Sequence, residues 1–157
     1  MGTAGIRVIA AMAVLAWWAP PAMADWAYTH WGMTPDQVAA ASARAVNVLP
    51  AAQRTRNDDD HWEIAAEGTY ADGPLRLPVG FMFDTQRGGL TCVLLNAIGA
   101  DAEALLQTLG TRYGKPTKDS HFLSARIVTW HTPDNVELTL GQRPVAAVVT
   151  HCLPDGP

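Results

Sequence analysis

The strongest constraint on the fold is a run of residues in which apolar and other side chains alternate with a period of two. Every second position of residues 75–83 is apolar: Leu75, Leu77, Val79, Phe81 and Phe83. This period is typical of a β-strand with one buried face. Residues 61–71 alternate in the same way, and residues 90–97 are apolar on both faces, which indicates a buried strand. Turn residues separate the three segments, which predicts consecutive strands.

The alternation in residues 61–71 assigns side chains to two faces of the first strand. The apolar face would carry Trp62, Ile64, Ala66 and Tyr70. The polar face would carry His61, Glu63, Glu67 and Thr69. We therefore expect Trp62 in the core, and Glu63 and Glu67 on one solvent-facing side of the strand.

Two helices are predicted, one before and one after these strands. Thr34 can cap the first helix, Pro35 suits its first position, and Gln37 completes a capping box. Its apolar stripe would comprise Val38, Ala41 and Ala45, with Val46 as a further candidate. The second helix would run from about Asp101 to Tyr113, and its apolar face would comprise Ala102, Leu105, Leu106, Leu109 and Tyr113.

The order helix-strand-strand-strand occurs twice along the chain. After the second helix, three more strands are predicted over residues 122–131, 136–141 and 145–152. We expect an α+β fold built as a tandem pseudo-repeat, with repeats of about residues 31–97 and 98–153. A six-stranded antiparallel sheet with both helices on one face would bury both amphipathic stripes. The other face of the sheet would remain open.

Residues 1–24 have the features of a cleaved export signal. Arg7 supplies the positive start, residues 8–19 form an apolar core, and Ala22, Met23 and Ala24 form a small-residue cleavage site. The apolar core is shorter than the roughly 18 residues that cross a bilayer, although an uncleaved anchor is the alternative. We expect a single domain, residues 25–157, in the periplasm or outside the cell, without a stable membrane anchor.

The charge balance of that domain is acidic. Without Arg7 it has 10 basic and 15 acidic side chains. The densest basic stretch is Arg54-Thr55-Arg56. Nucleic-acid binding needs a basic surface, so a nucleic-acid partner is not expected.

The chain contains two cysteines, Cys92 and Cys152. In an oxidising compartment the favoured interpretation is a disulfide between them. Two buried free thiols are the alternative, because cysteine is among the most buried residue types. A catalytic thiol is the least favoured interpretation, since no Cys-x-x-Cys motif is present.

Residues 32–38, Gly-Met-Thr-Pro-Asp-Gln-Val, resemble the Gly-Met-Thr-x-x-Gln-Val opening of the SmpA/OmlA family. Members of that family are small lipoproteins of the outer-membrane β-barrel assembly machinery. The resemblance covers roughly residues 31–95 and implies a helix that leads into three antiparallel strands. A doubled unit of this kind looks like the β-lactamase-inhibitor-protein fold. The resemblance concerns the fold.

No catalytic, cofactor-binding or metal-binding constellation is recognisable in the sequence. The three serines lack a nucleophile motif. Glu63 and Glu67 would be about 13 Å apart along a strand, too far for an inverting glycosidase pair. The five histidines, His30, His61, His121, His131 and His151, lack the spacing of a metal site. The alternative is a site assembled in space from His61, His131 and His151 on the open face.

The leading hypothesis is a non-enzymatic exported domain that binds another protein in the cell envelope through the open sheet face. The binding surface would include Glu63, Glu67, Arg76 and Met82. The alternative is a carrier of a small ligand or a metal that uses the histidines. A third hypothesis is an enzyme whose site is assembled from scattered residues.

Overall fold

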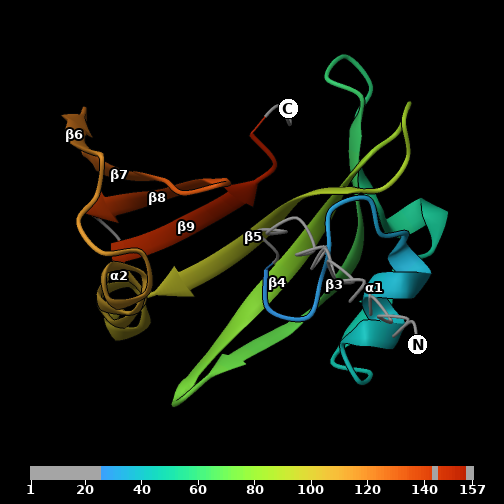
Figure 1. Cartoon of the computed structure of the whole chain (residues 1–157), viewed down its shortest axis with the longest axis horizontal. Helices are drawn as coiled ribbons and strands as arrows, with labels where there is room; N and C mark the ends of the chain where they lie inside the picture. The colour runs from blue at the N-terminus through green and yellow to red at the C-terminus, as the bar shows by residue number, and fades with distance from the viewer. Residues whose placement is uncertain (1–25, 143–144, 155–157) are drawn as a thin grey trace, which may run out of the picture.

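The computed structural model describes residues 26–142 and 145–154, which form a large antiparallel sheet and two α-helices (Figure 1). The predicted α+β class is therefore confirmed. The predicted export signal, residues 1–24, lies outside the described residues.

The elements of the first half precede Gly99. They are α1 (Pro35–Ala41), β1 (Val46–Val48), a short 3-10 helix (Ala51–Gln53), β2 (Thr55–Asn57), β3 (Trp62–Asp72), β4 (Leu75–Asp84) and β5 (Leu90–Ile98). The elements of the second half follow Gly99. They are α2 (Ala100–Tyr113), β6 (Lys118–Phe122), β7 (Ala125–His131), β8 (Asn135–Gln142) and β9 (Val145–Cys152).

The sheet has the strand order β1-β3-β4-β5-β9-β8-β7-β6, and β2 also pairs with β3. The two halves of the chain meet in the middle, where β5 and β9 are antiparallel neighbours. The predicted count of six strands is wrong, because the described residues form nine. The three additional strands, β1, β2 and β6, are short and lie toward the outer parts of the sheet.

Strands β6 and β7 show why the count differs. We expected a single strand over residues 122–131, but the chain reverses direction at Leu123, which has a φ of 54°. Residues 118–122 then pair back onto residues 125–129. A leucine with positive φ is uncommon, so the sequence at this turn does not indicate a hairpin.

One face of the sheet is buried beneath the helices. Opposite residues of an antiparallel ladder point to the same face. One cross-strand row on this face consists of Phe81, Val93, His151, Val136 and Trp130, all of which are buried. The buried side chains of the two helices belong to the core: Val38 of α1, and Ala102, Leu105 and Leu109 of α2. We call this the covered face and the opposite side the open face.

The register of β3 shifts by one residue between Ile64 and Ala66. Ile64 pairs with Met82, whereas Ala66 pairs with Phe81, and these two neighbours on β4 point to opposite faces. The irregularity therefore places Trp62 and Ile64 on the open face, away from Ala66 and Tyr70. The prediction that Trp62 lies in the core is wrong, since its side chain is only partly buried.

The first helix begins as predicted and ends earlier. Thr34 and Gln37 form the expected capping box: the Gln37 backbone N–H donates to the Thr34 hydroxyl, and the Thr34 backbone N–H donates to Gln37 Oε1. The helix stops at Ala41, and Ala43 and Arg44 both have positive φ, which breaks the helical path. Val46 is buried as part of β1 instead.

The segment before this helix crosses the β4–β5 turn. The Gly32 N–H donates to the Leu90 carbonyl at 2.9 Å, and the Leu90 N–H donates to the Met33 carbonyl at 2.8 Å. Gly32 has a φ of 85°, a conformation that glycine adopts without a steric cost. The Gly-Met-Thr stretch thus attaches the N-terminal segment to the sheet and then starts α1.

Candidate functional site

The open face carries a cluster of exposed apolar side chains at one end. Among the described residues, four large apolar side chains are classed as exposed: Ile98 at 74%, Phe122 at 67%, Leu123 at 90% and Val148 at 39%. Ile98 and Phe122 lie at opposite ends of one cross-strand row, whose inner members are Ala146, Gly141 and Ala125. Val148 lies two residues from Ala146 on β9, and Leu123 forms the adjoining turn. We call these seven residues the apolar end.

The apolar end has small residues at its centre and large apolar side chains at its two edges. Its row crosses five strands, β5, β9, β8, β7 and β6, and spans about 19 Å at the usual strand spacing. The two margins are Ile98 and Phe122, and small residues occupy the floor between them. Exposed apolar surface gathered in one place is a common feature of interaction sites, whereas isolated apolar residues are not.

Three of the four predicted partner-binding residues lie on the open face, in the first half of the chain. Glu67 pairs with Gly80, and Met82 pairs with Cys92, on the face opposite Phe81. Arg76 lies between the buried residues Leu75 and Leu77 and points away from the core. Glu67 and Arg76 are exposed, and Met82 is partly buried.

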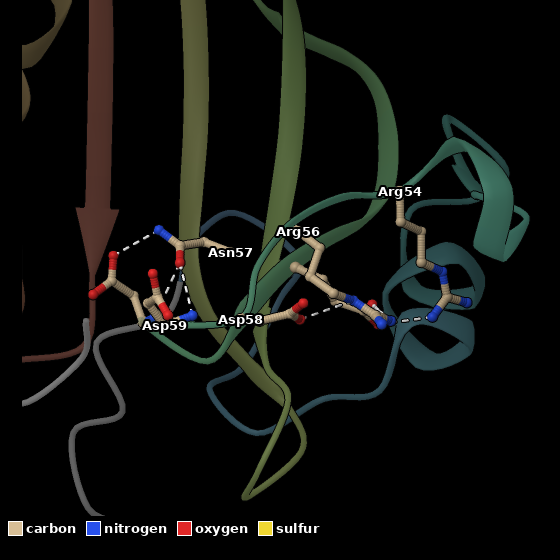
Figure 2. Close-up of polar contacts among 7 residues, drawn as sticks. Arg54, Arg56, Asn57, Asp58 and Asp59 are labelled. Carbon is tan, nitrogen blue, oxygen red and sulfur yellow. Dashed lines mark hydrogen bonds and ion pairs between the residues drawn. The ribbon is translucent and has the colours of Figure 1, made fainter.

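Glu63 lies apart from these three residues. It pairs with Phe83, so the irregularity in β3 turns it to the covered side of the sheet. There it accepts hydrogen bonds from Arg54 Nη1 and Arg56 Nη2, each at 2.7 Å (Figure 2). Burial disfavours the charged carboxylate, but the two guanidinium groups outweigh that effect and lower the pKa of Glu63. The expectation that Glu63 and Glu67 share one face of the strand is wrong.

The acidic stretch after β2 is a turn held by Asn57. Its side-chain oxygen accepts the backbone N–H groups of Asp59 and Asp60, at 3.0 and 3.1 Å, and its amide nitrogen donates to the Asp60 carboxylate at 2.7 Å (Figure 2). The carboxylates of Asp58, Asp59 and Asp60 belong to exposed residues. This arrangement is an asparagine-stabilised turn on the surface.

The two cysteines form the predicted disulfide. Cys92 on β5 and Cys152 on β9 are directly opposite in the central ladder, with a Cα–Cα distance of 4.1 Å. The bond lies on the open face and joins the two halves of the chain, which are separated by 60 residues at this point. Neither thiol is free to act as a nucleophile.

The histidines do not come together. His30, His61, His121 and His131 are exposed, whereas His151 is buried on the covered face. His131 lies opposite Asn135 on the other face, so it cannot share a site with His151. Within residues 26–142 and 145–154, no group of three His, Cys, Asp or Glu side chains is arranged to hold a metal ion.

The buried His151 takes part in a polar network that the sequence did not reveal. His151 Nε2 lies 2.7 Å from Asp134 Oδ2, and the Trp31 indole N–H donates to Asp134 Oδ1 at 3.0 Å. His151 and Asp134 are only 4% and 3% exposed. Alternation along β9 could have placed His151 on the covered face with Ala147 and Val149, but no sequence spacing connects it to Asp134.

A hollow of about 590 Å³ lies between the β3–β4 turn and α2. Its charged groups already satisfy each other, because Arg112 Nη2 lies 3.0 Å from Asp72 Oδ2 and 3.2 Å from the Tyr70 hydroxyl. The hydroxyls of Thr108 and Thr111, which also line the hollow, donate to carbonyls of α2 itself, so its polar groups are engaged with one another.

Comparison with protein-family models, with curated proteins and with solved structures finds no match for this chain. In the described part of the chain, neither helix has the length and apolar character needed to cross a membrane. The function must therefore be argued from the surfaces and buried groups described above.

Proposed function

We propose that this protein is a non-enzymatic domain that binds another protein in the cell envelope through the open face of its sheet. The observation that carries the proposal is the apolar end, where the large exposed apolar side chains gather on one face. Ile98, Phe122 and Leu123 are each more than half exposed. Burying an apolar side chain of this size stabilises a complex by about 1.5–3 kcal/mol before the costs of association.

The surroundings of the apolar end suit a protein interface. An interface usually has an apolar centre and a polar rim. On the open face, Glu137 and Lys118 lie two rows from Ile98 and Phe122, while Glu67 and Arg76 lie further along the sheet. The partner would contribute a compact apolar surface, with polar groups around it that reach these charged side chains.

The proposed location in the cell envelope is supported by two independent features. The disulfide between Cys92 and Cys152 is of a kind that persists in oxidising compartments. Residues 1–24 have the pattern of a cleaved signal. N-terminal sequencing of protein from a periplasmic fraction should begin at Asp25, and a start at Met1 would contradict cleavage.

We also infer that the two halves are pseudo-repeats and that the first half shares the SmpA/OmlA fold unit. In support, β3-β4-β5 and β7-β8-β9 are both antiparallel runs of consecutive strands. The last strands of the two runs, β5 and β9, pair with each other, and Cys92 lies directly opposite Cys152. Sequence profiles from relatives of each half should align over residues 34–97 and 100–152. Profiles that do not align would contradict the repeat.

The binding proposal can be tested by site-specific crosslinking in cells of the source organism. A photoreactive amino acid at position 98 would report on the apolar end, and the same group at position 107 would report on the exposed side of α2. We expect a discrete crosslinked product from position 98 alone.

A second substitution makes this test specific. Val148→Asp places a charge in the apolar end without disturbing the core, because Val148 is exposed. We expect it to abolish the product from position 98. A product that persists in the Val148→Asp variant, or the same product from position 107, would overturn the proposal.

A further inference from the structure

We propose that His151 and Asp134 form a pH-sensitive latch that fastens Trp31 to the covered face at neutral pH and releases it in mild acid. The latch joins three distant parts of the chain. Trp31 precedes α1, Asp134 lies in the β7–β8 turn, and His151 lies on β9.

The Asp134 carboxylate is the centre of the latch. One of its oxygens accepts the Trp31 indole N–H at 3.0 Å, and the other lies 2.7 Å from His151 Nε2. The carboxylate is almost completely buried, so it depends on these two donors for its stabilisation. Since Asp134 accepts at Oδ2, the neutral imidazole must carry its proton on Nε2.

The other imidazole nitrogen has no hydrogen-bond partner in the described part of the chain. His151 Nδ1 is buried, which a neutral ring tolerates because this nitrogen is then only an acceptor. Protonation would add a second N–H there, with no acceptor within reach. A buried donor without a partner is unfavourable, and more so when the group is charged.

The surroundings of the imidazole set its preference for the neutral form. From α2, the Tyr113 ring stands at 87° to the imidazole with centroids 6.2 Å apart, and Arg112 contributes a positive charge. From the strands, the paired neighbours Val93 and Val136 are apolar, and the Asp134 carboxylate contacts the imidazole from the β7–β8 turn. Burial and Arg112 outweigh the attraction of Asp134, so the pKa of His151 is lowered.

Trp31 is the element that must move when the imidazole is protonated. Its ring packs edge-on against His151, with centroids 5.6 Å apart, and is only partly buried. Lifting Trp31 would let water reach Nδ1. The rest of the segment would remain anchored by Trp26, whose ring lies 4.6 Å from that of Tyr70. The release is thus a local opening around Trp31.

Two indole N–H groups that donate hydrogen bonds, those of Trp31 and Trp130, provide a direct experiment. The Trp31 N–H is bonded to Asp134, whereas the Trp130 N–H donates to the Gly114 carbonyl at 3.0 Å. Indole hydrogen exchange would be followed by NMR on the full domain from pH 7.5 to 5. We expect the protection of Trp31 relative to Trp130 to fall by about tenfold per pH unit below about 6.5, the slope of one bound proton.

Variants separate the latch from general acid effects. His151→Gln keeps a neutral donor toward Asp134 and cannot titrate, so the ratio of the two protections should become independent of pH. His131→Gln removes an exposed histidine and should leave the wild-type slope unchanged.

Two results would overturn the proposal. The first is a ratio that does not change with pH in the wild type, or that changes equally in His151→Gln. The second needs no variant: an NMR titration midpoint for His151 in the wild type at or above that of a model histidine peptide. This measurement keeps the proposal testable even if His151→Gln fails to fold.

Discussion

A Cβ atom placed on Gly89 would lie 2.7 Å from the Cα of Gly32, closer than real side chains approach a backbone. The two glycines let the N-terminal segment cross the β4–β5 turn in direct backbone contact. Gly89 has a φ of 94°, and Gly32 has a φ of 85°. Glycine is therefore required at position 89 by this close backbone contact, and at position 32 its positive φ favours glycine independently of the capping of α1.

Gly89→Ala should be strongly destabilising, because the new methyl group meets the Gly32 backbone and the residue keeps a strained φ. We expect a loss of about 2–4 kcal/mol in the free energy of unfolding, measured by denaturant titration. Gly88→Ala is the matched control, since Gly88 has a φ of 71° but open space around its Cβ position. It should cost only about 1 kcal/mol. Equal losses would show that the contact with Gly32 is unimportant.

Glu63→Gln should destabilise the protein at neutral pH, because it weakens the hydrogen bonds from Arg54 and Arg56. A loss of about 1–2 kcal/mol is expected for hydrogen bonds to a charged group. Because the pKa of Glu63 is lowered in the folded state, its contribution is present above the unfolded pKa and is lost as the pH falls.

The difference between wild type and Glu63→Gln should therefore shrink between pH 5 and pH 3 when thermal unfolding is measured across this range. Glu67→Gln, at an exposed position on the same strand, should change stability by less than about 0.5 kcal/mol. A difference that stays constant down to pH 3 would contradict the role given to the carboxylate of Glu63.

Removal of the disulfide should destabilise the domain without changing its sheet. The bond closes a loop of 60 residues, which in the chain-entropy model is worth about 4 kcal/mol. Cys92→Ala combined with Cys152→Ala should lower the free energy of unfolding by about this amount. Reduced wild-type protein is the control and should match the double variant. Unchanged stability on reduction would mean that the pairing constrains little in the unfolded chain.

Leu105→Ala should lower stability by about 2–5 kcal/mol, because Leu105 of α2 is fully buried in the core. Leu106 is the next residue on the same helix and only partly buried, so Leu106→Ala should cost less than half as much. Unfolding curves of the two variants provide the comparison. A larger loss for Leu106 would mean that α2 packs through a different face.

The long elements could be predicted from local patterns. Strand β4 begins at the predicted Leu75 and ends at Asp84, one residue beyond the predicted apolar alternation, and α2 begins one residue before the predicted Asp101. In both, the spacing of apolar residues matches the period of the element, and local turn or breaker residues mark the ends. The pairing of Cys92 with Cys152 followed from their number and the expected compartment.

The features that were missed depend on distant parts of the chain. The irregularity at Ala65 reverses the faces of Trp62 and Glu63, and the sequence marks it only by the two adjacent alanines, Ala65 and Ala66. The β6–β7 hairpin turns at Leu123, a residue that does not favour positive φ. His151 and Asp134 are 17 residues apart in sequence, and only the pairing of β8 with β9 brings them together.

The pairing of β5 with β9 also determines the order in which the sheet can form during synthesis. Strand β5 can pair with β9 only after residues 146–152 have been synthesised. If the chain is synthesised or exported from its N-terminus, Cys92 remains a free thiol until Cys152, 60 residues later, emerges. During that interval the edge of β5 is unpaired and open to the wrong partner. Of the described strands, the last one to be synthesised is thus the one that completes the middle of the sheet.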